Sequence, residues 1–297
     1  MSRTDSRKAP FEVDYTAYYR WQWFARAQWR NDFRRTKRAS ATAFAQLVKE
    51  RGFSDKPVLD CTSGLGIKTI VIREAGLAVD GSDKCAFAVE HARLFAEEEG
   101  HGDLKFFEAA WQSLPKAAPT RYAAIFNDAL SWIYSKREMA ASLKGLHDAL
   151  LPGGILVYMG ALPGSRPQAK KLLADEWART EAGSKGFALG WRHAEGGVSV
   201  SEIQAADRGR DYIDRRHLYV IEEEGKEPRL EFMTLRCVYK WDWRVIKPLL
   251  LRAGFRKFTT KEFPAADGRR AHLVVAERGQ GRRPPAARGR AARHFPL

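Results

Sequence analysis

VLDCTSGLG at residues 58–66, followed by VDGSD at residues 79–83, is the stretch that decides the fold of this chain. The first run is typical of a buried parallel strand that ends in a carboxylate, Asp60, and continues into a tight glycine turn. The second run is predicted to be the next strand, and its acid Asp80 comes twenty residues after Asp60. A turn that exposes backbone N–H groups between two such acids suits a ligand that carries both an amine and a ribose.

A dinucleotide would need a different turn. The pyrophosphate-binding pattern is G-x-G-x-x-G, in which backbone N–H groups at a helix N-terminus hold the phosphates. Here Gly64 and Gly66 are followed by Ile-Lys-Thr, so the third glycine is missing. Asp60 would repel a pyrophosphate but attract the ammonium of a methionyl group. The spacing therefore favours S-adenosylmethionine over NAD; the alternative is a plain strand–turn–helix in which Asp60 and Asp80 only cap helices.

Composition predicts an ordinary globular protein. The chain has 297 residues, of which 44% are hydrophobic, enough to bury a substantial core. Cys61, Cys85 and Cys237 are widely spaced and form no C-x-x-C pair, so neither a disulfide framework nor a zinc site is expected. No apolar run is long enough to span a bilayer, and residues 1–10 lack the apolar stretch of a signal peptide. We expect a cytoplasmic protein that does not associate with membranes.

The net charge of +15 suggests nucleic-acid binding at first, but its distribution argues otherwise. Residues 1–40 hold ten Lys/Arg and four Asp/Glu, and residues 277–297 hold six Arg and one Glu. Only +4 of the total charge is left for the rest of the chain. The excess lies at the two ends, so a nucleic-acid partner is not expected for the body of the protein.

Strand-like and helix-like segments alternate through the first half of the chain. Strand-like runs at residues 104–109, 123–127 and 155–159 are separated by helical patterns such as residues 86–100 and 138–151. This order predicts an α/β fold with a parallel sheet, helices on both faces, and a ligand at the carboxyl ends of the strands.

The chain divides into three predicted parts. Residues 1–39 form a helical cap rich in aromatic residues, residues 40–277 form the α/β domain, and residues 278–297 form a basic disordered tail. Within the domain, residues 162–240 are an insertion that covers the substrate, with an antiparallel hairpin formed by residues 212–223 and 230–240. The cap helix is also a candidate contact for a homo-oligomer.

Four motifs in this order resemble the class I S-adenosylmethionine-dependent methyltransferases, and among them the glycine N-methyltransferase group. They are VLDCTSGLG (58–66), VDGSDK (79–84), EAAWQSL (108–114) and LLPGGILVY (150–158). The resemblance implies a Rossmann-like seven-stranded sheet, S-adenosylmethionine as cofactor and S-adenosylhomocysteine as product. Thr62 stands where the family usually has its first glycine.

The resemblance also implies roles for individual residues. The methionine portion would be lined by Asp60, Thr62, Gly64 and Gly66, with Trp29 and either Lys37 or Arg38 contacting it from the N-terminal helix; Arg38 is our choice. The ribose hydroxyls would bind Asp80 beside Gly81, and Ala110 with Trp111 would flank adenine. Asn127 would lie near the transferred methyl group. Tyr18 or Tyr19 would touch the substrate, because tyrosine rings favour a cationic ligand; packing of these rings is the alternative.

Three features bear on the acceptor. In the glycine enzymes an arginine after the fifth strand grips the substrate carboxylate, whereas residues 159–163 here contain none, which argues against glycine. A neutral amine needs no strong base during attack, whereas a hydroxyl does. The sequence shows no histidine with an obvious carboxylate partner, and His147 and His193 are expected to be surface or packing residues.

We therefore expect an S-adenosylmethionine-dependent methyltransferase that acts on an amine nitrogen of a small molecule. The alternatives are a small-molecule O-methyltransferase, an RNA methyltransferase or RNA-binding protein that uses the basic ends, and a non-catalytic S-adenosylmethionine-binding protein. Against RNA, the fourth strand ends in FNDAL rather than the N/D-P-P-Y/F signature that grips a flipped base. No metal is expected, because Asn127 and Asp128 lack a third acid nearby.

Overall fold

The computed structural model describes residues 14–159, 186–208, 212–238, 241–266, 268 and 270–279. Within these ranges a seven-stranded sheet forms the centre of the molecule, in the order β10-β11-β5-β4-β1-β2-β3. The strands are β1 (Val58–Asp60), β2 (Val79–Asp83), β3 (Lys105–Glu108), β4 (Tyr122–Asn127), β5 (Leu150–Tyr158), β10 (Phe255–Pro264) and β11 (Arg270–Arg278). The strands β1 to β5 pair in parallel, and β11 pairs antiparallel with both β5 and β10. The predicted seven-stranded α/β fold is confirmed.

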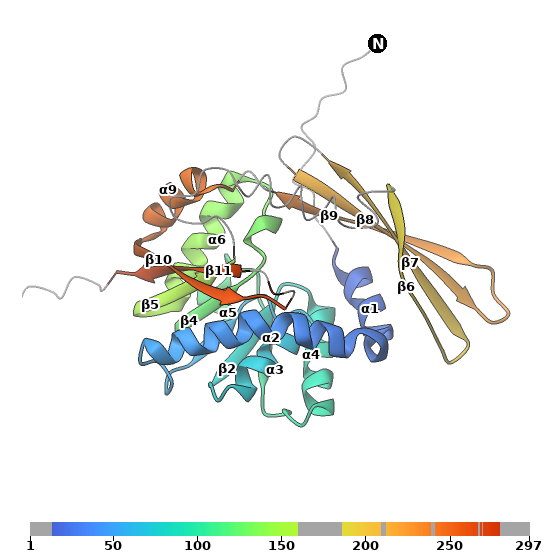
Figure 1. Cartoon of the computed structure of the whole chain (residues 1–297), viewed down its shortest axis with the longest axis horizontal. Coiled ribbons are helices and arrows are strands. Elements are labelled where there is room, and N and C mark those ends of the chain that lie inside the picture. Colours follow the sequence, from blue (N-terminus) through green and yellow to red (C-terminus); the bar gives the residue numbers. More distant parts are fainter. Residues whose placement is uncertain are drawn as a thin grey trace, which may run out of the picture.

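Helices cover both faces of this sheet (Figure 1). On one face lie α2 (Arg26–Glu50), α3 (Ile67–Glu74) and α4 (Ala86–Glu98), and on the other lie α5 (Leu114–Ala117), α6 (Lys136–Ala149) and α9 (Trp243–Ala253). Local signals set the helix starts: Ser135 caps α6 by accepting the N–H of Glu138 at 3.0 Å, and Asp242 caps α9 by accepting the N–H of Val245 at 3.1 Å. None of the helices in these described ranges is long and apolar enough to cross a membrane.

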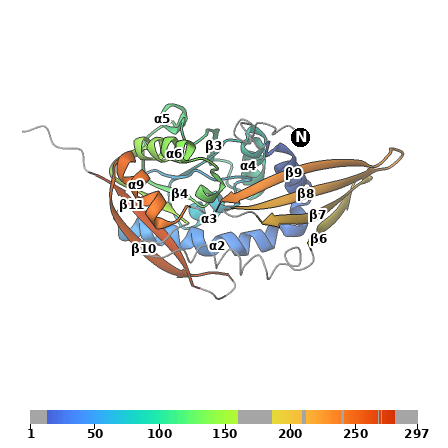
Figure 2. The same cartoon turned by 90° about the horizontal axis from the view of Figure 1, so that it is seen from above.

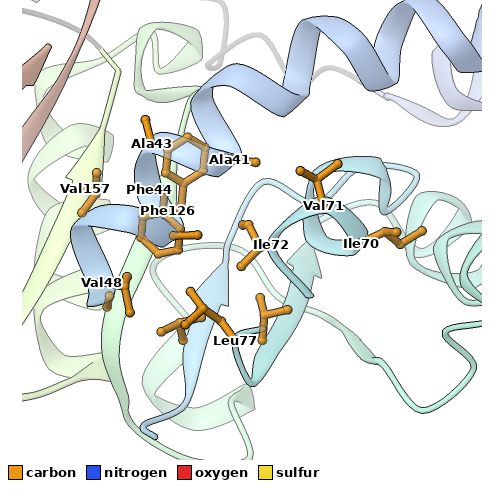
Figure 3. Packing of buried hydrophobic residues seen from close by; sticks show 14 of the residues in the cluster. Ala41, Ala43, Phe44, Val48, Ile70, Val71, Ile72, Leu77, Phe126 and Val157 are labelled. Atoms are coloured by element: carbon orange, nitrogen blue, oxygen red, sulfur yellow. The ribbon is translucent and has the colours of Figure 1, made fainter. Parts of the chain in front are cut away.

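The core is packed between α2, α3 and the middle of the sheet (Figure 3). Phe44 of α2 and Phe126 of β4 are both fully buried, with ring centroids 5.1 Å apart. Val157 of β5 and Ile72 of α3 fill the space around them. This packing holds β1 and β4 rigidly, and therefore also the turns at their carboxyl ends.

A second sheet of four antiparallel strands projects from this body (Figures 1 and 2). It contains β6 (Phe187–Glu195), β7 (Val198–Arg208), β8 (Tyr212–Glu223) and β9 (Arg229–Val238). The predicted hairpin corresponds to β8 and β9, whereas β6 and β7 were not predicted as strands. Of the insertion expected at residues 162–240, residues 162–185, 209–211 and 239–240 lie outside the described residues.

The N-terminal helix α1 (Thr16–Phe24) joins the two sheets. Trp21 packs against Tyr219 of β8 and donates its indole N–H to Glu231 of β9 at 2.8 Å. On the opposite side, Trp23 packs against Phe95 of α4. Helix α1 is therefore held on both sides. Its Tyr18 contacts His217 of the four-stranded sheet, and its Tyr19 contacts Asp83 of the seven-stranded sheet.

Candidate active site

A cavity of about 980 Å³ opens at the carboxyl ends of β1, β2, β3 and β4, which is where parallel α/β sheets bind ligands. The glycine turn after β1 and the loops after β2, β3 and β4 form its floor. Helix α1, the short 3₁₀ helix η1 (Leu130–Trp132), the start of α6 and Arg215 of β8 complete its walls.

The acid that faces this cavity from β2 is Asp83. Its Oδ2 accepts the backbone N–H of Gly64 at 3.1 Å, and its Oδ1 accepts that of Cys85 at 3.0 Å. Burial raises the pKa of Asp83, while these hydrogen bonds and one from Tyr19 oppose the rise. A carboxylate beside the glycine turn thus lies at the end of the second strand, as a ribose-binding acid would require.

Asp80, predicted to bind the ribose, does not face the cavity, whereas Asp83 does. Strand β2 continues three residues past Asp80, which lies opposite Leu59 within the sheet. Asp80 is not among the cavity-lining residues and accepts the hydroxyl of Tyr122 at 2.8 Å. Gly81 also lies outside the cavity, where a Cβ would collide with the ring of Phe106. The helix predicted from residue 86 gives the sequence signal for a later strand end, because a strand that ends at Asp83 leaves only Lys84 and Cys85 before the helix.

Asp60 does not offer a free carboxylate to a ligand, contrary to the prediction. It is fully buried, accepts the hydroxyl of Thr69 at 2.9 Å, and forms an ion pair with Lys68 at 3.2 Å. Its carboxylate therefore holds the turn from within, and Thr62, which does line the cavity, donates to it through its backbone N–H. Gly66 lies outside the cavity too: it has a φ of 86°, and a Cβ there would crowd Phe106 and Ala92.

A buried lysine binds the ends of β1 and β4 together at the cavity floor. The ammonium of Lys68 lies 3.0 Å from Asp128, whose other oxygen is 3.1 Å from Lys37 of α2. Burial works against both charges, but Lys68 and Lys37 hold the pKa of Asp128 well below its usual range. In the same way, Asp128 and Asp60 outweigh burial and raise the pKa of Lys68.

Lys37, rather than Arg38, is the basic residue of α2 at the cavity. Lys37 lines it, whereas Arg38 is exposed and lies 3.6 Å from Glu74 on the outside of α3. The choice of Arg38 is therefore corrected. The side chain of Trp29 falls outside the described part of the chain.

Aromatic side chains form the wall opposite the glycine turn. Tyr18 and Tyr19, the predicted substrate contacts, both line the cavity, and Tyr15 stacks on Trp132 with ring centroids 5.9 Å apart. The hydroxyl of Tyr19 lies 3.3 Å from Asp83. A Cβ on Gly64 would come within 3.2 Å of the Tyr19 ring, so the missing side chain allows this close approach.

The loop after β3 forms the side predicted for adenine. Ala110 and Trp111 line the cavity, and the indole N–H of Trp111 donates to the carbonyl of Cys61 at 2.8 Å. Gly145 of α6 packs directly on this loop, because a Cβ there would collide with the Trp111 carbonyl. The backbone of α6 therefore fixes where the loop can lie.

Asn127 shapes the end of β4 and does not line the cavity, which corrects its predicted role. It is fully buried, donates to the sulfur of Cys61 at 3.2 Å and accepts the N–H of Ala129 at 2.9 Å. The next residue, Asp128, reaches the cavity instead. Among the residues described, no group of three or more His, Cys, Asp or Glu is arranged to hold a metal ion.

Comparisons with known proteins agree with this architecture. The chain is 26% identical over 137 residues to a glycine/sarcosine N-methyltransferase of Halorhodospira halochloris, a match that covers 46% of this chain and 46% of that protein. The chain thus matches about half the length of that relative. No protein-family model matches it.

Two solved structures superpose over most of the chain. The sugar N-methyltransferase KedS8 of Streptoalloteichus sp. ATCC 53650 has a TM-score of 0.61 at 16% identity, covering 94% of this chain and 98% of KedS8. CalS10, an amino pentose methyltransferase of Micromonospora echinaspora solved with S-adenosylmethionine bound, has a TM-score of 0.54 at 15% identity, covering 92% of this chain and 99% of CalS10. The chain has the fold of the class I methyltransferases. At these identities the likeness shows the class I methyltransferase fold alone.

Proposed function

We propose that this protein is an S-adenosylmethionine-dependent methyltransferase that acts on an amine nitrogen of a small molecule. The observation that carries the proposal is the carboxylate of Asp83, placed beside the N–H of Gly64 inside a cavity at the strand ends. The likeness in sequence to an N-methyltransferase and in fold to amino-sugar methyltransferases supports the same reading.

The residues around the cavity fit the three parts of this cofactor. Asp83 would accept hydrogen bonds from the ribose hydroxyls, because a carboxylate accepts at both oxygens. Ala110 and Trp111 would flank adenine in the loop after β3. At the opposite end Lys37 would face the methionine carboxylate, while Asp128, also at the cavity, would face its ammonium.

When bound, S-adenosylmethionine supplies a methyl group on a positively charged sulfur, and loss of that methyl leaves a neutral thioether. The contribution of the protein is then to align the acceptor and exclude water. The cavity is lined by four aromatic rings, those of Tyr15, Tyr18, Tyr19 and Trp132, and aromatic ring faces attract a cationic centre. The packing of α1 between the two sheets keeps these rings in place.

The size of the cavity favours a small acceptor. About 980 Å³ is at the upper end of small-molecule pockets, which suits the cofactor together with one compact acceptor. A macromolecular acceptor would need an open surface beside the reacting atom, whereas here α1 and β8 contribute walls around it.

Calorimetry with S-adenosylmethionine tests the first half of the proposal, and absence of binding would overturn it. Turnover against a panel of aminosugars, amino acids, simple amines and phenols tests the second half. Methylation of at least one amine is expected, with the methyl located on nitrogen by mass spectrometry. Transfer to phenols alone would replace the nitrogen acceptor by an oxygen acceptor.

A further inference from the structure

A buried histidine–glutamate pair lies on the inner face of the four-stranded sheet, behind the tyrosine wall of the cavity. His217 of β8 is 6% exposed and Glu202 of β7 is 3% exposed. Nδ1 of His217 lies 2.8 Å from Oε1 of Glu202. The other histidine–carboxylate contacts among the described residues, such as that of His193 with Glu195, involve more exposed side chains.

Glu202 orients the imidazole and sets its tautomer. Because a carboxylate is an acceptor, Nδ1 of His217 carries the hydrogen of this bond, and Nε2 carries the lone pair when the ring is neutral. The second oxygen of Glu202 accepts the amide N–H of Gln204 at 2.7 Å, so the carboxylate is held from both sides. Nε2 of His217 is buried and has no hydrogen-bond partner in the described part of the chain. An unpaired buried nitrogen of this kind lowers stability, which makes a role in proton transfer worth testing.

Tyr18 connects this pair to the cavity. The rings of Tyr18 and His217 contact each other edge to face, with centroids 5.7 Å apart, and Tyr18 lines the cavity. Arg215 lies two residues from His217 along β8, on the same face of the strand, and also lines the cavity. Burial raises the pKa of Tyr18, so its hydroxyl stays protonated and can both donate and accept a hydrogen bond.

We propose that His217, oriented by Glu202, takes a proton from the acceptor ammonium through the hydroxyl of Tyr18. In the structure no hydrogen bond joins the Tyr18 hydroxyl to Nε2 of His217, so the relay requires the Tyr18 side chain to turn its hydroxyl toward that nitrogen when the acceptor binds. One N–H bond of the ammonium then breaks and its proton passes to the Tyr18 oxygen, while the Tyr18 hydroxyl proton passes to Nε2 of His217. The acceptor nitrogen keeps the electron pair and becomes a neutral amine, and the imidazolium charge is balanced by Glu202. Tyr18 is the residue that touches the substrate, and His217 and Glu202 are positioning residues that act through it. This inference rests on the proposed amine methyltransferase function.

Other groups around His217 do not replace this role. From β7 it faces Glu202 and Gln204, and from β8 its neighbours on the same face are Arg215 and Tyr219. Its partner across β9 is Met233, which is apolar. Glu202 is therefore the one carboxylate in direct contact with the imidazole among the residues described.

The first experiment needs no acceptor. Nitrogen NMR of the full chain labelled with ¹⁵N-histidine is recorded at pH 8. The signals of His217 are identified as those that disappear in the His217→Asn variant. A protonated Nδ1 and an unprotonated Nε2 are expected, with the Nε2 signal shifted in Tyr18→Phe. The inverse tautomer, or an Nε2 signal that does not shift in Tyr18→Phe, would overturn the proposal. This measurement does not depend on turnover. It therefore tests the contacts of His217 with Glu202 and Tyr18 even if no amine in the panel is methylated and the proposed function is wrong.

The second experiment uses the best amine from the panel. His217→Asn is expected to lower kcat at pH 7 by about 100-fold or more, the usual size of a general-base effect. The loss should fade as the pH rises above the pKa of the amine, because a neutral amine needs no proton acceptor. His193→Asn, on the same sheet and also beside a glutamate, serves as the matched control and should keep wild-type kcat. A loss in His217→Asn that is equal at every pH would indicate a packing role and refute the proposal.

Discussion

Replacing Asp83 by asparagine is expected to weaken S-adenosylmethionine binding by about 10- to 100-fold. A hydrogen bond to a charged group contributes about 1.5–3 kcal/mol, and each 1.4 kcal/mol is a factor of ten in Kd. Asparagine keeps the shape of the side chain and one acceptor oxygen, but its NH₂ group cannot accept a ribose hydroxyl. Because burial already raises the pKa of Asp83, loss of its charge should change the free energy of unfolding by less than about 2 kcal/mol.

Calorimetry with S-adenosylmethionine and with S-adenosylhomocysteine measures this effect, and thermal unfolding checks that the variant is folded. The matched control is Asp80→Asn, in the same strand but outside the cavity, where it accepts the hydroxyl of Tyr122. The control should bind the cofactor within about twofold of wild type. Wild-type affinity in Asp83→Asn together with weak binding in Asp80→Asn would refute the assignment of Asp83.

Four further outcomes can be measured. Lys68→Met should lower the free energy of unfolding by about 3–5 kcal/mol in denaturant titrations, because it leaves two carboxylates without their buried partner; a loss below 1 kcal/mol would contradict the ion-pair network. The lowered pKa of Asp128 means that its contribution to stability is complete above about pH 4 and is lost as the pH falls from there, so Asp128→Asn should flatten the acid limb of unfolding curves. Gly64→Ala should destabilise the fold less in a Tyr19→Ala background than alone, since the clash with that ring disappears; strict additivity in this double-mutant cycle would refute the contact. Gly145→Ala should weaken cofactor binding from outside the cavity by displacing the loop after β3, and calorimetry that finds wild-type affinity would show that this loop does not contact the cofactor.

Much of the fold could be predicted because its signals are local. The run at residues 58–66 contains a strand, an acid and a glycine turn in sequence. The alternation of strand-like and helix-like segments predicts the parallel sheet. The aromatic residues of α1 lie on a helix, within the helical cap predicted for residues 1–39. The strands β6 and β7 were missed because half-exposed antiparallel strands in the projecting sheet carry a weaker hydrophobic pattern.

The errors at the site share one physical cause, which is that each depends on contacts between separate strands and helices. Whether Asp80 or Asp83 reaches the cavity depends on how far β2 extends beside β1 and β3, which is a property of strand pairing. Likewise, the sequence does not show that the charge of Asp60 is balanced by Lys68, because both groups are desolvated only once α3 packs on the sheet.

The sequence by itself determined the α/β class, the glycine turn at the end of the first strand and the aromatic character of the helix above it. Only the tertiary structure decided which acid faces the cavity, which lysine lies at the cavity floor, and that His217 meets Glu202. That last pair is fifteen residues apart and forms because the register of β7 and β8 brings the two side chains onto one face. Periodicity along a chain predicts elements, whereas register and packing between elements select the atoms that meet in the cavity.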